Sequence, residues 1–158
     1  MAAYFFDSSA LIKRYVNEPG SPWVAAVTAP IAGAHVYVAA VTGVEVVATF
    51  ARKLRGRLVS PGDVAAAVSR FRHDFENEYR VVAVTDAVII RSMATAEAYA
   101  LRGYDAVQLG AALELNGRRL ALGAAPLMFV TADAELLAAA GAEGLPADDP
   151  NNHRAGSG

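Results

Sequence analysis

The chain contains no cysteine among its 158 residues, which excludes disulfide bonds and thiolate metal sites. It also lacks a long apolar run. The longest, residues 36–51, has Glu45 near its middle, so no transmembrane helix is predicted. The apolar N-terminal stretch ends at Asp7 and is too short for a signal peptide. These absences predict a soluble, cytoplasmic protein.

Several motifs of nucleotide binding and catalysis are missing as well. There is no glycine-rich dinucleotide fingerprint and no Walker-type phosphate loop. The histidines His35, His73 and His153 are scattered along the chain, so we expect no histidine metal set. Ser8 and Ser9 have no histidine and aspartate placed as triad partners in the sequence, which argues against a serine hydrolase.

The residues that are present predict one globular domain. Hydrophobic residues make up 54% of the chain and charged residues 19%, a balance typical of a folded protein. The length fits a single domain. We place this domain at residues 1–145, because residues 146–158 are polar, rich in Asp, Asn and Gly, and predict a mobile tail.

Short apolar runs alternate with segments of helical periodicity along the chain. Strands are predicted at residues 4–6, 35–39, 81–84 and 127–130, with a weak fifth near 144–145. Helices are predicted at residues 10–16, 23–28, 42–56, 60–79, 87–101, 105–115 and 132–140. The predicted N-caps are Ser8 or Ser9, Thr42 in a capping box with Glu45, and Thr85 or Asp86, and Gly103 is predicted to follow a helix C-terminus. This order predicts an α/β fold with a mostly parallel sheet of four or five strands and helices on both faces.

Four acidic residues follow strands or turns on separate segments: Asp7, Glu45, Asp105 and Asp133. Ligands bind beyond the carboxyl ends of parallel strands, so we expect these side chains to face one crevice. Their sequence neighbours are largely apolar, and an unpaired carboxylate in such surroundings is costly. No cation is placed to pair with all four, and crowded carboxylates repel one another. A divalent cation removes this conflict, and hard oxygen ligands select Mg²⁺ or Mn²⁺.

Each acid also has a structural interpretation. Carboxylates near helix N-termini complement the helix dipole, and Asp105 and Asp133 could be caps. Glu45 shares a helix face with polar residues and could lie on the surface. Glu135 lies close enough to Asp133 to compete for its assignment.

The basic residues give a net charge of only −2, but 12 of the 14 are arginine. Arg52, Lys53, Arg55 and Arg57 form a run after Glu45, and the planar fork of arginine suits phosphate oxygens. The alternative is that these are ordinary solvated charges at a helix C-terminus, which favours cations in any case.

Four segments together resemble the PIN-domain ribonucleases, specifically the VapC-type toxins of bacterial toxin–antitoxin pairs. Residues 6–13 look like the family's opening Asp-Ser/Thr-Ser-Ala-Leu segment, and residues 42–45 look like its helix-borne glutamate. Residues 101–109 look like its third-acid segment, and residues 129–133 like its final strand followed by Asp. The four occur in order at suitable spacing, and the resemblance spans roughly residues 4–140.

The resemblance implies a PIN fold of three layers and an endoribonuclease that depends on Mg²⁺ or Mn²⁺. It also implies a homodimer and a cognate antitoxin that blocks the site. Ser9 and Thr131 lie where the family often carries hydroxyls that support the acids. The metal-binding and catalytic residues that it implies are Asp7, Glu45, Asp105 and Asp133.

The reaction predicted from these residues is hydrolysis of RNA by metal-activated water, with Arg52, Lys53 and Arg55 guiding the RNA backbone. Single-stranded or looped RNA is favoured, because an A-form duplex hides its base edges. One alternative is a non-catalytic RNA-binding or assembly module on the same fold. Another is a phosphoacceptor signalling domain. That class needs paired acids after the first strand and a late lysine, whereas Asp7 stands alone and the only lysines are Lys13 and Lys53.

Overall fold

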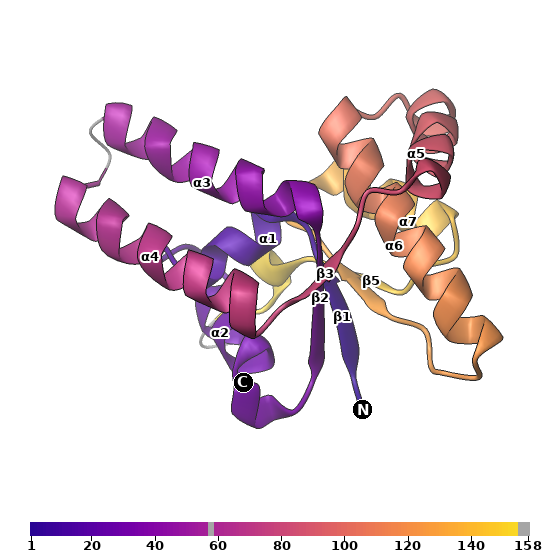
Figure 1. Cartoon of the computed structure of the whole chain (residues 1–158), viewed down its shortest axis with the longest axis horizontal. Helices are drawn as coiled ribbons and strands as arrows, with labels where there is room; N and C mark the ends of the chain where they lie inside the picture. The colour runs from indigo at the N-terminus through magenta and orange to yellow at the C-terminus, as the bar shows by residue number, and fades with distance from the viewer. Residues whose placement is uncertain (57–58, 155–158) are drawn as a thin grey trace.

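The computed structural model describes residues 1–56 and 59–154, and a five-stranded sheet lies at its centre (Figure 1). The strands are β1 (Ala3–Phe6), β2 (His35–Ala39), β3 (Arg80–Val82), β4 (Met128–Val130) and β5 (Ala147–Asp148). All neighbouring strands pair in parallel, in the order β3-β2-β1-β4-β5. The predicted α/β class with a parallel sheet is therefore confirmed.

Helices cover both faces of this sheet (Figure 1). On one face lie α1 (Ser8–Leu11), α2 (Ser21–Thr28), α3 (Ala40–Arg55) and α4 (Pro61–Asn77). On the other lie α5 (Asp86–Tyr99), α6 (Gly103–Ala121) and α7 (Ala134–Ala142). Short 3₁₀ helices are η1 (Ile12–Arg14), η2 (Pro30–Ala32) and η3 (Pro150–Asn152). Within the described residues, no helix combines the length and the apolar character needed to cross a membrane.

The two faces of the sheet bury separate hydrophobic clusters, because neighbouring residues of a strand point to opposite faces. Phe5 packs with Leu109 and Phe129 under α5–α7, and the rings of Phe5 and Phe129 stack with centroids 5.7 Å apart. Phe6 points the other way and packs with Phe50 of α3. Burying one such side chain stabilises the fold by roughly 1.5–3 kcal/mol. The strand ends, and the residues that follow them, are therefore held firmly.

The central strand β1 lies where the chain changes direction across the sheet. From β1 the chain proceeds to β2 and β3 on one side, and later to β4 and β5 on the other. A crevice opens beyond the carboxyl ends of the strands at such a switch point. Asp7 follows β1 directly, and Asp133 lies just after β4. The strand order therefore brings both acids to one edge of the sheet.

The first helix begins differently from the prediction. Asp7, and neither Ser8 nor Ser9, caps α1, and its Oδ1 accepts a hydrogen bond from the backbone N–H of Ala10 at 2.9 Å. The carboxylate reaches the open helix end because it directly follows β1. The hydroxyl of Ser9 turns to the same carboxylate instead of to the backbone of the helix.

The predicted capping box at Thr42 and Glu45 is wrong. α3 begins at Ala40, directly after β2, and Ala39 occupies the cap position without a side-chain hydrogen bond. Thr42 lies inside the helix and is fully buried. No loop separates β2 from α3, so the helix begins before the residue whose side chain could have capped it.

The next predicted boundaries are right in part. Of the two residues predicted to cap α5, Thr85 is the observed cap, and it accepts from a backbone N–H at 3.3 Å. Ala100, with φ of +52°, follows the end of α5, whereas Gly103 starts α6. β3 spans residues 80–82 where we predicted a strand at 81–84, and Val81 is 43% exposed because β3 is an edge strand.

The sheet also continues past residue 145, where we placed the end of the domain. β5 pairs with β4 at residues 147–148, beyond the predicted position at 144–145. The ring of His153 stacks on Trp23 of α2 with centroids 4.2 Å apart, and its Nε2 lies 2.8 Å from Oδ2 of Asp148. The chain therefore packs on the domain up to residue 154, and residues 155–158 of the predicted tail lie outside the described residues.

Candidate metal centre

All four predicted acids line one pocket at the carboxyl edge of the sheet, which we call the acid pocket. Its volume is about 300 Å³. The residues that line it are Asp7, Ser8, Ser9, Ile12, Glu45, Thr49, Asp105, Gln108 and Asp133. They come from α1, η1, α3, α6 and the start of α7. The fold thus gathers residues that are up to 126 positions apart, from 7 to 133, in the sequence.

Asp7 is the most buried of the four acids, with 3% of its surface exposed. Its carboxylate accepts hydrogen bonds from Ser9 Oγ at 2.8 and 3.0 Å, from Thr131 Oγ1 at 2.6 Å and from the N–H of Ala10. Burial raises the pKa of Asp7 to about 6 although these donors lower it, and the charge of Asp105 raises it further. The donors hold this carboxylate in one orientation at the floor of the pocket.

The two predicted supporting hydroxyls both contact Asp7. Ser9 Oγ also accepts from the backbone N–H of Ala132 at 3.0 Å, and Thr131 Oγ1 accepts from the backbone N–H of Asp133 at 3.1 Å. Because each hydroxyl accepts from a backbone N–H, its proton is free to point at the carboxylate. Ser9 and Thr131 therefore connect the end of β1 to the turn between β4 and α7.

Asp105 lies in the first turn of α6 and accepts no hydrogen bond from the described residues. Its pKa is raised by burial and by the charges of Asp133 and Glu45, while Arg102 lowers it. Across the described part of the chain, no lysine, arginine or histidine nitrogen lies within 4.0 Å of the carboxylate oxygens of the four acids. The pocket therefore concentrates negative charge that no ion pair with the protein neutralises.

Gln108 belongs to the site but was missed as a site residue from the sequence. It lies one turn after Asp105 on α6 and is 1% exposed. Its Nε2 is within hydrogen-bond distance of Glu45 Oε1 at 2.9 Å, Thr42 Oγ1 at 2.8 Å and Ser8 Oγ at 3.2 Å. It orients the glutamate and connects α6 to α3. The sequence did contain a signal for this role, because Gln108 is an amide in an apolar stretch and lies on the same helix face as Asp105.

Asp133 caps α7, and its Oδ1 accepts from the N–H of Leu136 at 2.8 Å. Capping engages this one oxygen, and Oδ2 accepts no hydrogen bond from the described residues. Glu135, the competing candidate, is exposed and does not line the acid pocket. The structure therefore favours Asp133 as the fourth acid of the pocket, and the cap and a ligand role are compatible.

The predicted RNA-guiding residues lie at the end of α3. Arg52 donates to Oγ1 of Thr49 at 3.1 Å, and Thr49 lines the acid pocket, so this guanidinium reaches the pocket rim. Lys53 lies 4.0 Å from a glutamate in the loop between η1 and α2. Arg55 is exposed, and Arg57 lies outside the described residues.

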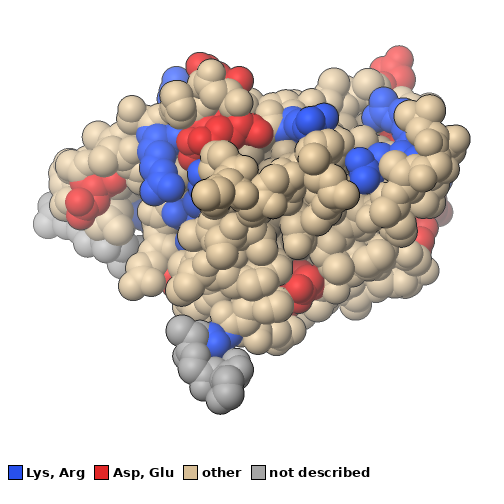
Figure 2. Space-filling model, turned by 90° about the horizontal axis from the view of Figure 1, so that it is seen from below, with Lys and Arg blue, Asp and Glu red and all other residues tan. Residues whose placement is uncertain are grey.

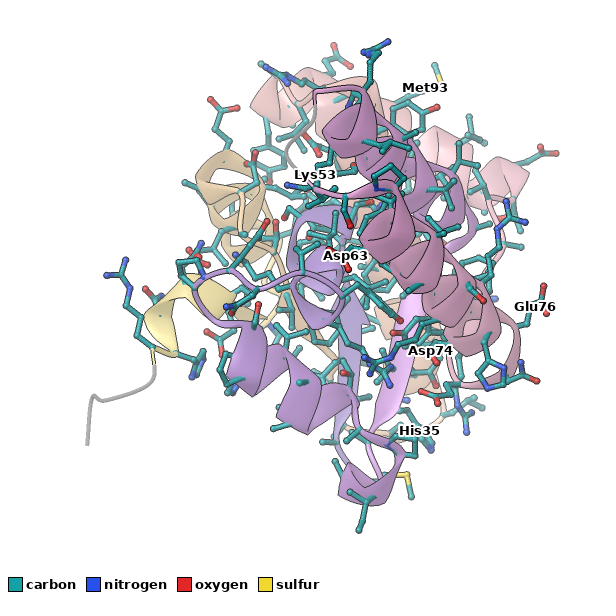
Figure 3. The ribbon with its side chains drawn as sticks, turned by 90° about the vertical axis from the view of Figure 1, so that its left-hand side faces the viewer. His35, Lys53, Asp63, Asp74, Glu76 and Met93 are labelled. Atoms are coloured by element: carbon teal, nitrogen blue, oxygen red, sulfur yellow. The ribbon has the colours of Figure 1, made fainter. Side chains whose placement is uncertain are left out.

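A second group of potential metal ligands lies at the end of α4, away from the acid pocket. The ligand atoms of His73, Asp74 and Glu78 all lie within 4.8 Å of one another. Arg14 lies 3.7 Å from Asp74, which Figure 3 labels, and 3.0 Å from Glu78. The hydroxyl of Tyr15 donates to Asp74 at 2.7 Å. Arginine already balances these carboxylates, so we assign the group a structural role.

Comparison with known proteins gives matches among solved structures. No family model matches the chain, and neither does any curated protein. A toxin–antitoxin complex from Klebsiella pneumoniae matches with a TM-score of 0.62 and 18% identity, over 93% of this chain and 97% of that one. FitAcB from Neisseria gonorrhoeae matches with a TM-score of 0.64 and 13% identity, over 93% of this chain and 97% of that one. VapBC2 from Rickettsia felis, bound to a DNA fragment from its promoter, matches with a TM-score of 0.60 and 9% identity, over 93% of this chain and 98% of that one.

The chain has the PIN-domain fold. Its parallel sheet in the order β3-β2-β1-β4-β5, with helices on both faces, matches that fold over more than 90% of the chain. The resemblance carried by the four sequence segments is therefore confirmed for the fold. At 9–18% identity, the likeness to these structures shows the fold alone.

The donor atoms of the acid pocket in this PIN domain fit a hard divalent cation. The described residues that line the pocket offer carboxylate, hydroxyl and amide oxygens, and neither sulfur nor imidazole. Among the residues that the structure describes, no three of its carboxylates bring oxygens within 4.8 Å of one another. Mg²⁺ usually keeps several of its waters and binds proteins through only one or two carboxylates. The spacing of the carboxylates in the acid pocket therefore suits Mg²⁺, whose remaining ligands are waters.

Proposed function

We propose that this PIN domain is an endoribonuclease dependent on Mg²⁺ or Mn²⁺, and the toxin of a toxin–antitoxin pair. One observation carries the proposal. Asp7, Glu45, Asp105 and Asp133 come from four separate segments to one pocket, and none has a cationic partner within the described residues. Charged groups buried without a partner cost several kcal/mol each, and a bound cation offsets that cost.

The proposed reaction is hydrolysis of an RNA phosphodiester bond. A divalent cation held in the acid pocket would lower the pKa of a bound water and stabilise charge on the attacked phosphate and the leaving oxygen. Asp7 and Asp105 would hold this ion most directly, together with Glu45, which Gln108 orients. Asp133 would hold a second ion or orient the attacking water. Hydrogen bonds from Ser9 and Thr131 fix the direction of the Asp7 carboxylate.

The proposal includes two protein partners. The first is a cognate antitoxin that covers the acid pocket, supported by the likeness of the fold to a toxin–antitoxin complex. The second is another copy of this chain in a homodimer. Purification of the tagged chain from its own cells, with mass spectrometry of the co-purified proteins and light scattering of the sample, tests both. Recovery of a lone monomer under all conditions contradicts this part of the proposal.

The activity is tested by incubating the purified protein with RNA in Mg²⁺, in Mn²⁺ or in EDTA. We expect cleavage in either metal and none in EDTA. Asp105→Asn keeps the side-chain shape and removes the charge. We expect its cleavage rate to fall by more than about 100-fold, which exceeds the loss typical of a residue that only hydrogen-bonds a metal ligand. Glu97→Gln is the matched control, because Glu97 is an exposed acid of α5 outside the acid pocket.

Cleavage that continues in EDTA, or at an undiminished rate in Asp105→Asn, contradicts the metal mechanism. RNA binding without turnover in any metal favours a non-catalytic RNA-binding module instead. If the activity is present, sequencing RNA ends after brief expression, beside the Asp105→Asn protein, identifies the cleaved RNA and the position of the cut.

A further inference from the structure

A second cavity, which we call the basic cavity, lies beside the edge strand β3. It has a volume of about 530 Å³ and is bounded by Tyr37 of β2, by β3 and by the C-terminal half of α6. Its charged lining residues are Arg80, Arg118 and Arg119, and no acid stands among the described residues that line it. The basic cavity and the acid pocket therefore have opposite charge and share α6.

Two of the three arginines lie against one aromatic ring. The guanidinium carbons of Arg80 and Arg119 are 5.9 and 5.8 Å from the centroid of Tyr37. Arg119 also donates to the carbonyl oxygen of Ala125 at 3.1 Å, while its Nε is buried and has no hydrogen-bond partner among the described residues. Within the same residues, none of the three arginines lies within 4.0 Å of a carboxylate. The protein therefore leaves this positive charge unbalanced.

His35, at the start of β2, experiences the same positive charge. Its Nε2 lies 3.2 Å from the guanidinium of Arg80, a contact in which the neutral imidazole accepts. Desolvation, and then the charges of Arg80, Arg119 and the N-terminal amine, lower the pKa of His35.

Figure 3 shows His35 at one end of the molecule and Lys53 toward the other. Figure 2 looks from below and shows Lys and Arg side chains on both halves of that face, including the half that holds α6 in Figure 1.

Helix geometry alone does not explain this cluster. Arg118 and Arg119 lie in the last turn of α6, where cations complement the helix dipole. Arg80 comes from β3 and has no such reason to be there. Like charges held close together repel, and the face of one tyrosine offsets only part of that cost. An anion in the cavity would complete the balance, and the arginine forks suit phosphate oxygens in particular.

We propose that the basic cavity binds phosphate groups of the RNA strand that is cleaved in the acid pocket, an inference that rests on the ribonuclease function proposed above. Asp105 and Arg119 are 14 residues apart on α6. At about 1.5 Å per residue, this places the two sites about 21 Å apart along one rigid helix. Residues 108–113 of α6 are buried, so a strand that contacts both sites passes over the surface beside this helix. Phosphate contacts position a strand without reading its sequence, so the cavity favours longer RNA and not a particular base.

The test measures binding of single-stranded RNA to the whole chain in EDTA over a range of salt concentrations. The probes are RNAs of about 16 and about 4 nucleotides, and inorganic phosphate. The variants are Arg80→Gln, Arg118→Gln and the double variant. Arg119 is left unchanged because its Nε is buried and its guanidinium donates to the carbonyl oxygen of Ala125. The control is Arg91→Gln, which removes an exposed charge of α5 outside both sites.

We expect the double variant to bind the longer RNA about tenfold more weakly, equally for different sequences. The slope of log affinity against log salt should become shallower by about 0.7 for each phosphate contact that is lost. Binding of the short RNA and the behaviour of Arg91→Gln should stay at the wild-type level. In Mg²⁺, the double variant should lose more cleavage rate on the longer RNA than on the short RNA.

An unchanged affinity and salt slope in the double variant overturn the inference. An equal loss in Arg91→Gln also overturns it, because it shows a general effect of charge. Weaker binding of inorganic phosphate without weaker binding of RNA assigns the cavity to a small anion, which again overturns it. If the wild type cleaves nothing in any metal while the double variant loses affinity for the longer RNA, the ribonuclease proposal fails and the phosphate site stands.

Discussion

Asp7→Asn is expected to remove a pH-dependent loss of stability from the metal-free protein. Burial raises the pKa of Asp7 from 3.8 to about 6 in the folded chain. A carboxyl whose folded pKa is raised contributes stability below its unfolded pKa, and this contribution is lost as the pH rises through the folded pKa. The difference is about 2.2 pH units. At about 1.36 kcal/mol per pH unit, the full loss is about 3 kcal/mol.

The assay is urea unfolding in EDTA at several pH values between 4 and 7, for the wild type and Asp7→Asn. Asparagine also weakens the hydrogen bonds with Ser9 and Thr131, at about 1 kcal/mol each. That cost is the same at every pH, so it cancels when the stability difference between the two proteins is followed against pH. We expect the difference to shift in favour of Asp7→Asn by about 2–3 kcal/mol from pH 4 to pH 7.

A stability difference that does not change with pH refutes this reasoning, because it means that Asp7 titrates alike in the folded and unfolded chains. Glu97→Gln serves as the control for loss of an exposed acid. Mg²⁺ added at pH 7 should stabilise the wild type more than Asp7→Asn, since a ligand that binds the folded state raises its stability.

Four further substitutions test helix packing and the residues of the acid pocket. Gly110→Ala should destabilise the protein by about 1–3 kcal/mol, because a β-carbon there would lie 2.2 Å from a serine hydroxyl of α5. Gly117→Ala, with nothing within 4 Å, should stabilise it by up to about 1 kcal/mol, and thermal unfolding compares the two. Gln108→Leu should reduce RNA cleavage at limiting Mg²⁺ by about 10–100-fold, with partial recovery at high Mg²⁺, and an unchanged Mg²⁺ dependence contradicts this. Thr131→Val removes a hydrogen bond that lowers the pKa of Asp7, so the pKa of Asp7 should rise. As the pH is lowered, Mg²⁺ binding measured by calorimetry should therefore weaken at a higher pH in Thr131→Val than in the wild type.

Local features of the sequence determined the elements and the fold class. The apolar, β-branched run at residues 35–39 predicts β2 at the bounds that the structure has, because it differs sharply from the Pro- and Gly-containing segment before it. Helix caps were less predictable. Asp7, Ser8 and Ser9 are adjacent residues whose side chains can all cap a helix N-terminus. Which of them caps α1 depends on how β1 positions them relative to the helix.

The identities of the acids were also readable from the sequence, because each lies in a short segment with its own pattern. Their meeting was only an expectation until the strand order was known. Asp7 and Asp133 share an edge because β1 and β4 are neighbours, and that pairing joins segments far apart in the chain. Strand neighbours are chosen by the packing of the whole sheet, which no local pattern records.

The sequence by itself therefore determined which residues carry charge and which segments form strands and helices. Tertiary structure alone decided the partners of the buried polar groups. Gln108 reaches Glu45 across 63 positions, and the ring of Tyr37 lies beside both Arg80 of β3 and Arg119 of α6. Periodicity and capping signals describe neighbours within about one turn, whereas a buried amide or guanidinium takes its partner from whichever element the fold packs against it.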